Sequence, residues 1–144
     1  MQEYIEFFQQ NLVLSVVWIG LLVAIVVTVF KSSTAVFKTI TAAETTLLMN
    51  KENGVVVDIR SKDEFKAGHI TDALHILPSE IKEGNIANLE KHKSDPIIVV
   101  CKTGQTARES ANLLAKAGFE KVNLLKNGLI SWNEANLPLV RGKK

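Results

Sequence analysis

Cysteine, histidine and N-terminal positive charge are all scarce in this sequence. Its 144 residues include a single cysteine, Cys101, and three separated histidines. One cysteine excludes an internal disulfide, and it suits a reducing compartment. A metal site is not expected, because structural zinc needs four nitrogen or sulfur ligands.

Positive charge is absent from the first thirty residues and modest in the rest. All 17 Lys and Arg residues lie at position 31 or later, whereas two of the 15 acidic residues, Glu3 and Glu6, precede it. The resulting positive excess suits an anionic small molecule or an anionic membrane surface. It is too weak and scattered to indicate nucleic acid as a partner.

An uncharged apolar run, residues 12–30, predicts one transmembrane helix. Its nineteen residues would reach about 28 Å as a helix, close to the ~30 Å hydrocarbon thickness. Fourteen of them are Leu, Val, Ile or Phe, which favours insertion by roughly 4 to 8 kcal/mol. A cleaved signal peptide would want a positive start and a small-residue cleavage site. A buried core helix would rarely be apolar on all faces at a terminus.

The charges around this run predict its orientation. Lys31 and Lys38 follow it and no basic residue precedes it, so the C-terminal part is expected in the cytoplasm. We therefore expect a short extracytoplasmic N-terminus at 1–11, the membrane helix at 12–30, a juxtamembrane linker at 31–38 and a globular domain at 39–141. The lipid bilayer is then a partner of the chain.

Alternating strand and helix patterns predict an α/β fold with a central, mainly parallel sheet flanked by helices. Thr41–Glu44 and Ser61–Glu64 have the spacing of capping boxes and predict two helix starts. Strands are expected at 55–59, 74–77, 97–100 and 122–125, and helices at 41–50, 61–68, 79–83, 86–92, 106–117 and 128–135.

Cys101 stands where a predicted strand ends and a predicted helix is about to begin. Ligands collect at the carboxyl ends of strands in such sheets. If the loop 101–106 curls around the sulfur, its amides form an anion nest, with Gly104 permitting the turn. The helix N-terminus adds partial positive charge, so the loop can hold a thiolate without a general base. A buried structural cysteine is the competing interpretation. The expected anion loop consists of Lys102, Thr103, Gly104, Gln105 and Thr106.

Three motifs, in this order along the chain, resemble those of the rhodanese, or thiosulfate sulfurtransferase, family. VVVDIRSKDEFKAGHITDALHI resembles its first signature, VVCKTGQTA its active-site loop, and LLKNGLISWNEANLP its C-terminal signature. The likeness covers about residues 39 to 141. Many members carry arginine at the fifth position after the cysteine, where this chain has Thr106, and the C-terminal signature usually has Gly-Gly, where Asn127-Gly128 stands.

The resemblance implies a rhodanese-like fold and sulfur transfer through a Cys101 persulfide. The donor would be a small anion such as thiosulfate, and the acceptor a thiol, cyanide or a carrier protein, with no cofactor and no metal. An anchored single rhodanese domain is similar to a known bacterial inner-membrane protein. That likeness implies a single-pass protein of the inner membrane.

The remaining polar residues of interest are assigned mainly structural roles. We expect Asp58 and Arg60 to form an architectural pair and His69 to be a structural hydrogen-bonder. Arg60 and Arg108 are also candidates for the rim of the site. A Cys-dependent phosphatase would need arginine six positions after the cysteine, where Ala107 stands. The main alternative is a rhodanese-like binding or regulatory module that recruits partners to the membrane.

Overall fold

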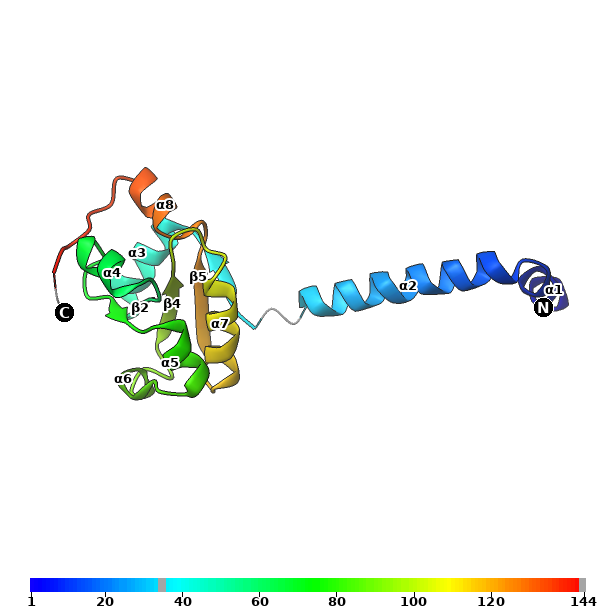
Figure 1. Cartoon of the computed structure of the whole chain (residues 1–144), viewed down its shortest axis with the longest axis horizontal. Helices are drawn as coiled ribbons and strands as arrows, with labels where there is room; N and C mark the ends of the chain where they lie inside the picture. The colour runs from blue at the N-terminus through cyan, green and yellow to red at the C-terminus, as the bar shows by residue number, and fades with distance from the viewer. Residues whose placement is uncertain (34–35, 143–144) are drawn as a thin grey trace. The chain divides into compact units, whose positions relative to one another are not determined.

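The computed structural model describes residues 1–33 and 36–142, which fall into one unit before position 35 and a second unit from Val36 onward (Figure 1). The first unit consists of helix α1 (Gln2–Gln10) and helix α2 (Leu12–Ser33). Over Leu12–Val29, α2 is long and apolar enough to cross a membrane. The hydroxyl of Thr28 donates to the Ala24 carbonyl at 2.7 Å, so this polar group is satisfied within the helix.

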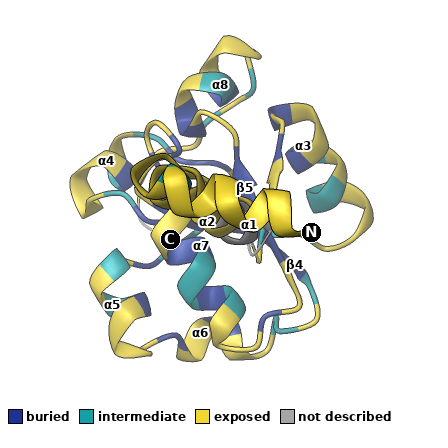
Figure 2. Ribbon diagram, turned by 90° about the vertical axis from the view of Figure 1, so that its right-hand side faces the viewer, coloured by how far each residue is buried: buried dark blue, intermediate teal, exposed yellow. Residues whose placement is uncertain are grey.

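Helix α1 was not expected from the sequence, which predicted only a short N-terminus over 1–11. The helix ends at Asn11, whose amide donates to the carbonyl of Phe7. None of its residues is buried, and its exposed apolar side chains are Tyr4, Ile5, Phe7 and Phe8. Figure 2 shows α1 and α2 as mostly exposed up to Val29, whereas buried residues line the strands of the second unit.

The second unit is built on a parallel sheet of five strands in the order β1-β5-β4-β2-β3. The strands are β1 (Lys38–Ile40), β2 (Val55–Asp58), β3 (Leu74–His75), β4 (Pro96–Val100) and β5 (Lys121–Leu125). Strand β4 lies in the centre and all five of its residues are buried. Its near-continuous apolar sequence is what a strand covered on both faces requires.

Helices cover both faces of this sheet, as the α/β prediction requires. They are α3 (Ala42–Lys51), α4 (Lys62–Ala67), α5 (Pro78–Glu83), α6 (Ala87–Glu90), α7 (Ala107–Lys116) and α8 (Gly128–Glu134). One face packs against α5, α6 and α7 in a core that includes Val57, Val99 and Leu114. The other face packs against α3, α4 and α8, with Ile98, Phe65 and Trp132 in that core.

The expected capping boxes are both present. The side chain of Thr41 accepts from the amide of Glu44 at the start of α3, and Glu44 accepts in return from the Thr41 amide at 2.7 Å. Ser61 and Glu64 make the same pair of bonds at the start of α4. These reciprocal bonds satisfy amides that the first helical turn leaves without partners.

The structure differs from the sequence-based prediction mainly between residues 31 and 40. The predicted linker at 31–38 is shorter, because α2 continues to Ser33 and β1 already begins at Lys38. Its positions 34 and 35 lie outside the described residues. Strand β1 was not predicted at all, since it has three residues and two of them are exposed. It forms one edge of the sheet by pairing with β5.

Candidate functional site

The site lies where β4 and β2 end side by side. Asp58, the last residue of β2, is paired with Val100, the last residue of β4. The amide of Ile59 then donates to the Val100 carbonyl at 3.0 Å, so the two chains leave the sheet together. Cys101 is the next residue after β4, at the carboxyl edge where ligands of parallel sheets bind.

The sulfur of Cys101 is buried and receives a backbone hydrogen bond from its own loop. Cys101 is 5% exposed and also contributes to the core on the α7 side of the sheet. The amide of Gly104 donates to Sγ at 3.0 Å. Gly104 has a φ of +87°, a conformation that glycine adopts without strain. An amide aimed at the sulfur stabilises negative charge on it.

The N-terminus of α8 holds the cysteine loop, residues 101–106, through two backbone hydrogen bonds. The Leu129 amide donates to the carbonyl of Cys101 at 2.9 Å, and the Ile130 amide donates to the carbonyl of Lys102 at 3.4 Å. Gly128 makes this approach possible, because a Cβ there would overlap the Cys101 carbonyl oxygen. The sequence contained a signal for this contact, since Asn127-Gly128 favours two successive positive φ values. The sequence-based prediction places Gly128 in the C-terminal signature and at the start of a helix, without this contact.

The other residues of the expected anion loop are mostly at the surface. Lys102, Thr103, Gln105 and Thr106 are exposed, whereas Gly104 is buried. Lys102 lies within electrostatic reach of Glu64. Hydrogen bonds from the Ser61 hydroxyl and amide lower the pKa of Glu64, and the charges of Arg60 and Lys102 lower it further. Lys102 therefore brings positive charge to the side of the loop that faces α4.

Asp58 and Arg60 form a pair of parallel hydrogen bonds. Arg60 Nε donates to Asp58 Oδ1 at 3.0 Å and Nη2 donates to Oδ2 at 2.7 Å. Arg60 Nη2 also donates to the Gly68 carbonyl at 2.6 Å, which ties the end of β2 to the end of α4. The Asp58 side chain is 1% exposed and that of Arg60 is 11% exposed. These contacts suit the architectural role expected for the pair, because they already occupy the guanidinium of Arg60.

His69 and His75 make structural contacts near this pair. His69 Nδ1 lies 2.8 Å from the Phe65 carbonyl, and its ring stacks on the Phe65 ring. The backbone of His69 exchanges two hydrogen bonds with Val140. His75 Nε2 lies 2.7 Å from the Arg60 carbonyl. Both rings are thus engaged with the backbone around the site.

Arg108 is exposed in the first turn of α7, and it lines a cavity beside the loop together with Thr103, Gly104 and Gln105.

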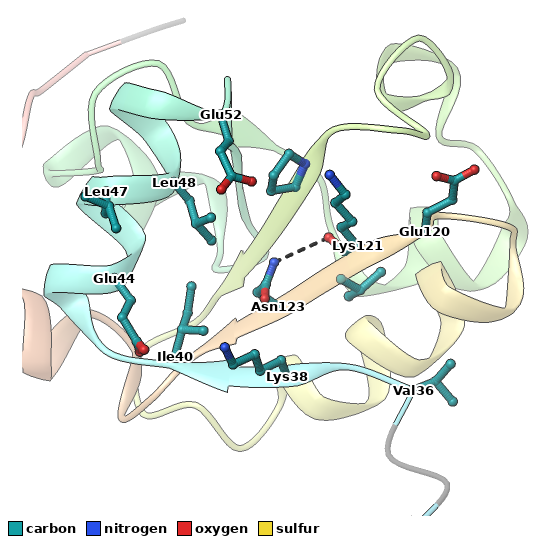
Figure 3. A pocket seen from close by; sticks show the side chains of 12 residues that line it. Val36, Lys38, Ile40, Glu44, Leu47, Leu48, Glu52, Glu120, Lys121 and Asn123 are labelled. Carbon is teal, nitrogen blue, oxygen red and sulfur yellow. Dashed lines mark hydrogen bonds between the residues drawn. The ribbon is translucent and has the colours of Figure 1, made fainter.

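A larger cavity of ≈ 460 Å³ lies elsewhere in the domain, against α3 and the first residues of β4 and β5 (Figure 3). Pro96 and Lys121 line it at the opposite ends of these strands from Cys101. Within 1–33 and 36–142, no three His, Cys, Asp or Glu residues are grouped as metal ligands.

Comparison with known proteins agrees with this architecture. The rhodanese-like domain family matches residues 41–135. The uncharacterized protein YibN of Escherichia coli K12 is 52% identical over 143 residues, which are 99% of this chain and 100% of that protein. Thiosulfate sulfurtransferase GlpE of Pseudoalteromonas translucida is 36% identical over 101 residues, 69% of this chain and 91% of that protein. The rhodanese-like domain of Anabaena sp. Alr3790 superposes with a TM-score of 0.61 at 26% identity, over 72% of this chain and 79% of that domain.

Proposed function

Because the chain belongs to the rhodanese-like domain family, we propose that it is a sulfurtransferase that carries sulfur as a persulfide on Cys101. The observation that carries this proposal is the hydrogen bond from the Gly104 amide to Cys101 Sγ, 3.0 Å long, at the carboxyl end of β4. A structural cysteine has no need of a backbone donor aimed at its sulfur. The relationship to GlpE proteins of the thiosulfate sulfurtransferase class supports the same chemistry.

The reaction consists of two displacements at sulfur. In the first, the Cys101 thiolate attacks the outer sulfur of thiosulfate, the sulfur–sulfur bond of the donor breaks, and sulfite leaves with the bonding electron pair. The persulfide anion on Cys101 is then stabilised by the amide of Gly104. In the second, a thiolate or cyanide attacks the outer sulfur of the persulfide, and the Cys101 thiolate is regenerated. No oxidant, reductant or general base is required.

The environment of Cys101 favours small donors. With 5% of the residue exposed, little of the sulfur surface is open to approach. Lys102, which is exposed, supplies positive charge at this edge of the sheet. A small anion fits both features, because it is attracted by positive charge and needs only a narrow opening.

Mass spectrometry of the intact chain tests the assignment. We expect incubation with thiosulfate to add the mass of one sulfur atom, and cyanide to remove it. Cys101→Ser should gain no mass under the same conditions, and Thr46→Ser, on α3 away from the loop, should behave as the parent. A chain that gains no sulfur from thiosulfate or other sulfane donors would refute the proposal. So would an equal gain in Cys101→Ser.

A binding or regulatory role is the second candidate, and the burial of Cys101 in the core favours it. A domain that only recruits partners would use Cys101 as a packing residue. Cys101→Ala would then keep the cellular phenotype of the parent chain, whereas a sulfurtransferase would lose it. Two results together separate the roles: whether a persulfide forms on Cys101, and whether Cys101→Ala has the phenotype of the parent chain.

We also propose that α2 anchors the domain in the bacterial inner membrane, with the C-terminal domain in the cytoplasm. The support is the apolar stretch Leu12–Val29 and the basic residues that follow this stretch in the sequence, Lys31 and Lys38. The chain should stay in the membrane pellet after alkaline extraction. A reporter that works only in the cytoplasm should be active when fused after Lys144. A reporter that works only in the periplasm should be inactive at the same position. Release by alkali, or activity of a periplasmic reporter, would contradict the anchor or its orientation.

A further inference from the structure

A cavity of ≈ 240 Å³ lies beside the cysteine loop and is lined by cations but by no carboxylate. Three strands or helices, the cysteine loop and the turn after β5 contribute to it. Its lining residues are Thr39 of β1, Thr103, Gly104 and Gln105 of the loop, Arg108 of α7, Leu124 of β5, and Lys126 and Asn127 of the turn. Cys101 is not among them, so this cavity is separate from the sulfur.

The two cations of this cavity are available to a ligand. Within the described part of the chain, neither Arg108 nor Lys126 forms an ion pair. Glu109, the neighbour of Arg108 in sequence, instead lines another cavity with Lys82. The cavity of Figure 3 is different in kind, because it contains three glutamates beside its two lysines. Uncompensated positive charge therefore distinguishes the cavity beside the loop.

The polar side chains around the cations also lack hydrogen-bond partners among the residues that the structure describes. The side chains of Thr103, Gln105 and Asn127 make no hydrogen bond to other described residues. Their hydroxyl and amide groups are donors that an oxyanion can use. The volume is below the roughly 300 to 1,000 Å³ of pockets for drug-sized ligands, so the occupant must be small.

We propose that this cavity binds a small tetrahedral oxyanion with two negative charges, of the sulfate or phosphate type. Arg108 and Lys126 approach from α7 and from the end of β5, and they neutralise its charge. The neighbouring hydroxyl and amide side chains complete its hydrogen bonds. Gly104 lines the cavity and also donates to Cys101 Sγ, so the anion contacts the same loop segment that holds the sulfur. The proposal does not depend on sulfur transfer, since the anion binds whether or not Cys101 is reactive.

Isothermal titration calorimetry on the full chain in uncharged detergent tests this site, with sodium sulfate and sodium phosphate as the probes. We expect saturable binding of at least one of these anions. Arg108→Gln and Lys126→Gln should each weaken it by about tenfold or more, because each removes a charge-assisted donor. Lys126→Arg should bind within about threefold of the parent, because it restores the charge.

Two controls locate the anion. Lys116→Gln removes an exposed charge from the last turn of α7 and should leave the affinity unchanged. Cys101→Ser should also bind the anion as the parent does, which separates this site from the persulfide chemistry. If neither sulfate nor phosphate binds saturably, the proposal is overturned. It is equally overturned if Lys126→Gln binds normally. If Cys101→Ser loses binding as well, the anion sits at the sulfur and not in this cavity.

Discussion

The amide of Leu129 donates a hydrogen bond to the carbonyl of Cys101 at 2.9 Å. This bond joins the first turn of α8 to the residue that carries the sulfur. Because α8 is packed into the core through Leu129 and Trp132, it gives the loop a rigid support. The position of Cys101 therefore depends on a helix that lies close in space but well separated from it along the chain.

Replacing Gly128 with alanine should break this support. The new Cβ would overlap the Cys101 carbonyl oxygen and lie 2.7 Å from the Lys102 carbonyl carbon, and both are backbone atoms that cannot move cheaply. Gly128 also has a φ of +58°. We expect a loss of stability of about 1–3 kcal/mol from the overlap, beyond the cost of the backbone conformation. Denaturant unfolding measures the stability, and thiosulfate-dependent mass gain measures loop integrity.

Gly84→Ala is the matched control for this change. Gly84 has a φ of +78°, and a Cβ there would meet no atom within 4 Å. It should lose only the conformational contribution, about 1–2 kcal/mol, and keep its reaction with thiosulfate. Equal losses of stability in the two variants, with sulfur uptake intact in both, would show that α8 does not hold the loop.

Gly104→Ala should disturb the sulfur in addition to the conformational cost that it shares with Gly84→Ala, because Gly104 has a φ of +87°. Its Cβ would lie 3.2 Å from the Asn127 amide nitrogen, so the loop must shift by a few tenths of an ångström. The shift would move the amide that donates to Cys101 Sγ. We expect the alkylation rate of Cys101 by iodoacetamide to fall several-fold, because the Gly104 amide would no longer hold Sγ in place. An alkylation rate equal to that of the parent and of Gly84→Ala would argue against a role for this amide.

Features set by neighbouring residues could be predicted from the sequence. The capping boxes at Thr41 and Ser61 are local patterns, and both form as expected. The short apolar run at 97–100 predicted a strand, because such a run is typical of a strand covered on both faces, and it forms β4 with every residue buried. The place of Cys101 at the end of this strand followed directly.

Features that depend on distant contacts could not be predicted in this way. Strand β1 has too few residues to show a periodicity, and it forms because it pairs with the edge of β5. The Gly68 carbonyl that binds Arg60 has no signal in the sequence, since any residue carries a carbonyl. Lys126 has no signal in the sequence, because only the order of the strands brings it to the cavity that Arg108 also lines.

Breaking the pair of Asp58 and Arg60 should destabilise the domain strongly. Asp58→Asn removes the charge of a side chain that is 1% exposed and leaves the guanidinium of Arg60 without its counter-ion. We expect a loss of about 3–5 kcal/mol, as for other buried pairs in which one partner is removed. The loss in Asp58→Asn/Arg60→Gln should be smaller than the sum of the two single losses.

An exposed pair provides the control for this prediction. Glu90 and Lys93 lie 3.0 Å apart with 53% and 44% of their side chains exposed. Glu90→Gln should cost less than about 1 kcal/mol in the same denaturant experiment, because solvent screens the pair. If Asp58→Asn cost no more than Glu90→Gln, the architectural role of the buried pair would be disproved.

The capping boxes should make stability depend on acid pH. The amide of Thr41 donates to Glu44, and the hydroxyl and amide of Ser61 donate to Glu64; these bonds lower the pKa of each carboxyl from its ordinary value of 4.5. A folded-state pKa below the unfolded one means that the unfolded state binds more protons on acidification. The contribution of each carboxylate is therefore complete above pH 4.5 and is lost as the pH falls through the lowered folded value.

Glu64→Gln isolates one of these contributions. Glutamine can still accept the hydrogen bonds from Ser61, but it does not titrate, so the variant should lose less stability than the parent between pH 6 and about pH 3. Denaturant unfolding at a series of pH values gives the two slopes. Glu83→Gln is the control, because Glu83 makes no hydrogen bond or ion pair with other described residues. A slope for Glu64→Gln that matches those of the parent and of Glu83→Gln would mean that the Ser61 cap does not prefer the charged carboxylate, and that the start of α4 is held by backbone and packing alone.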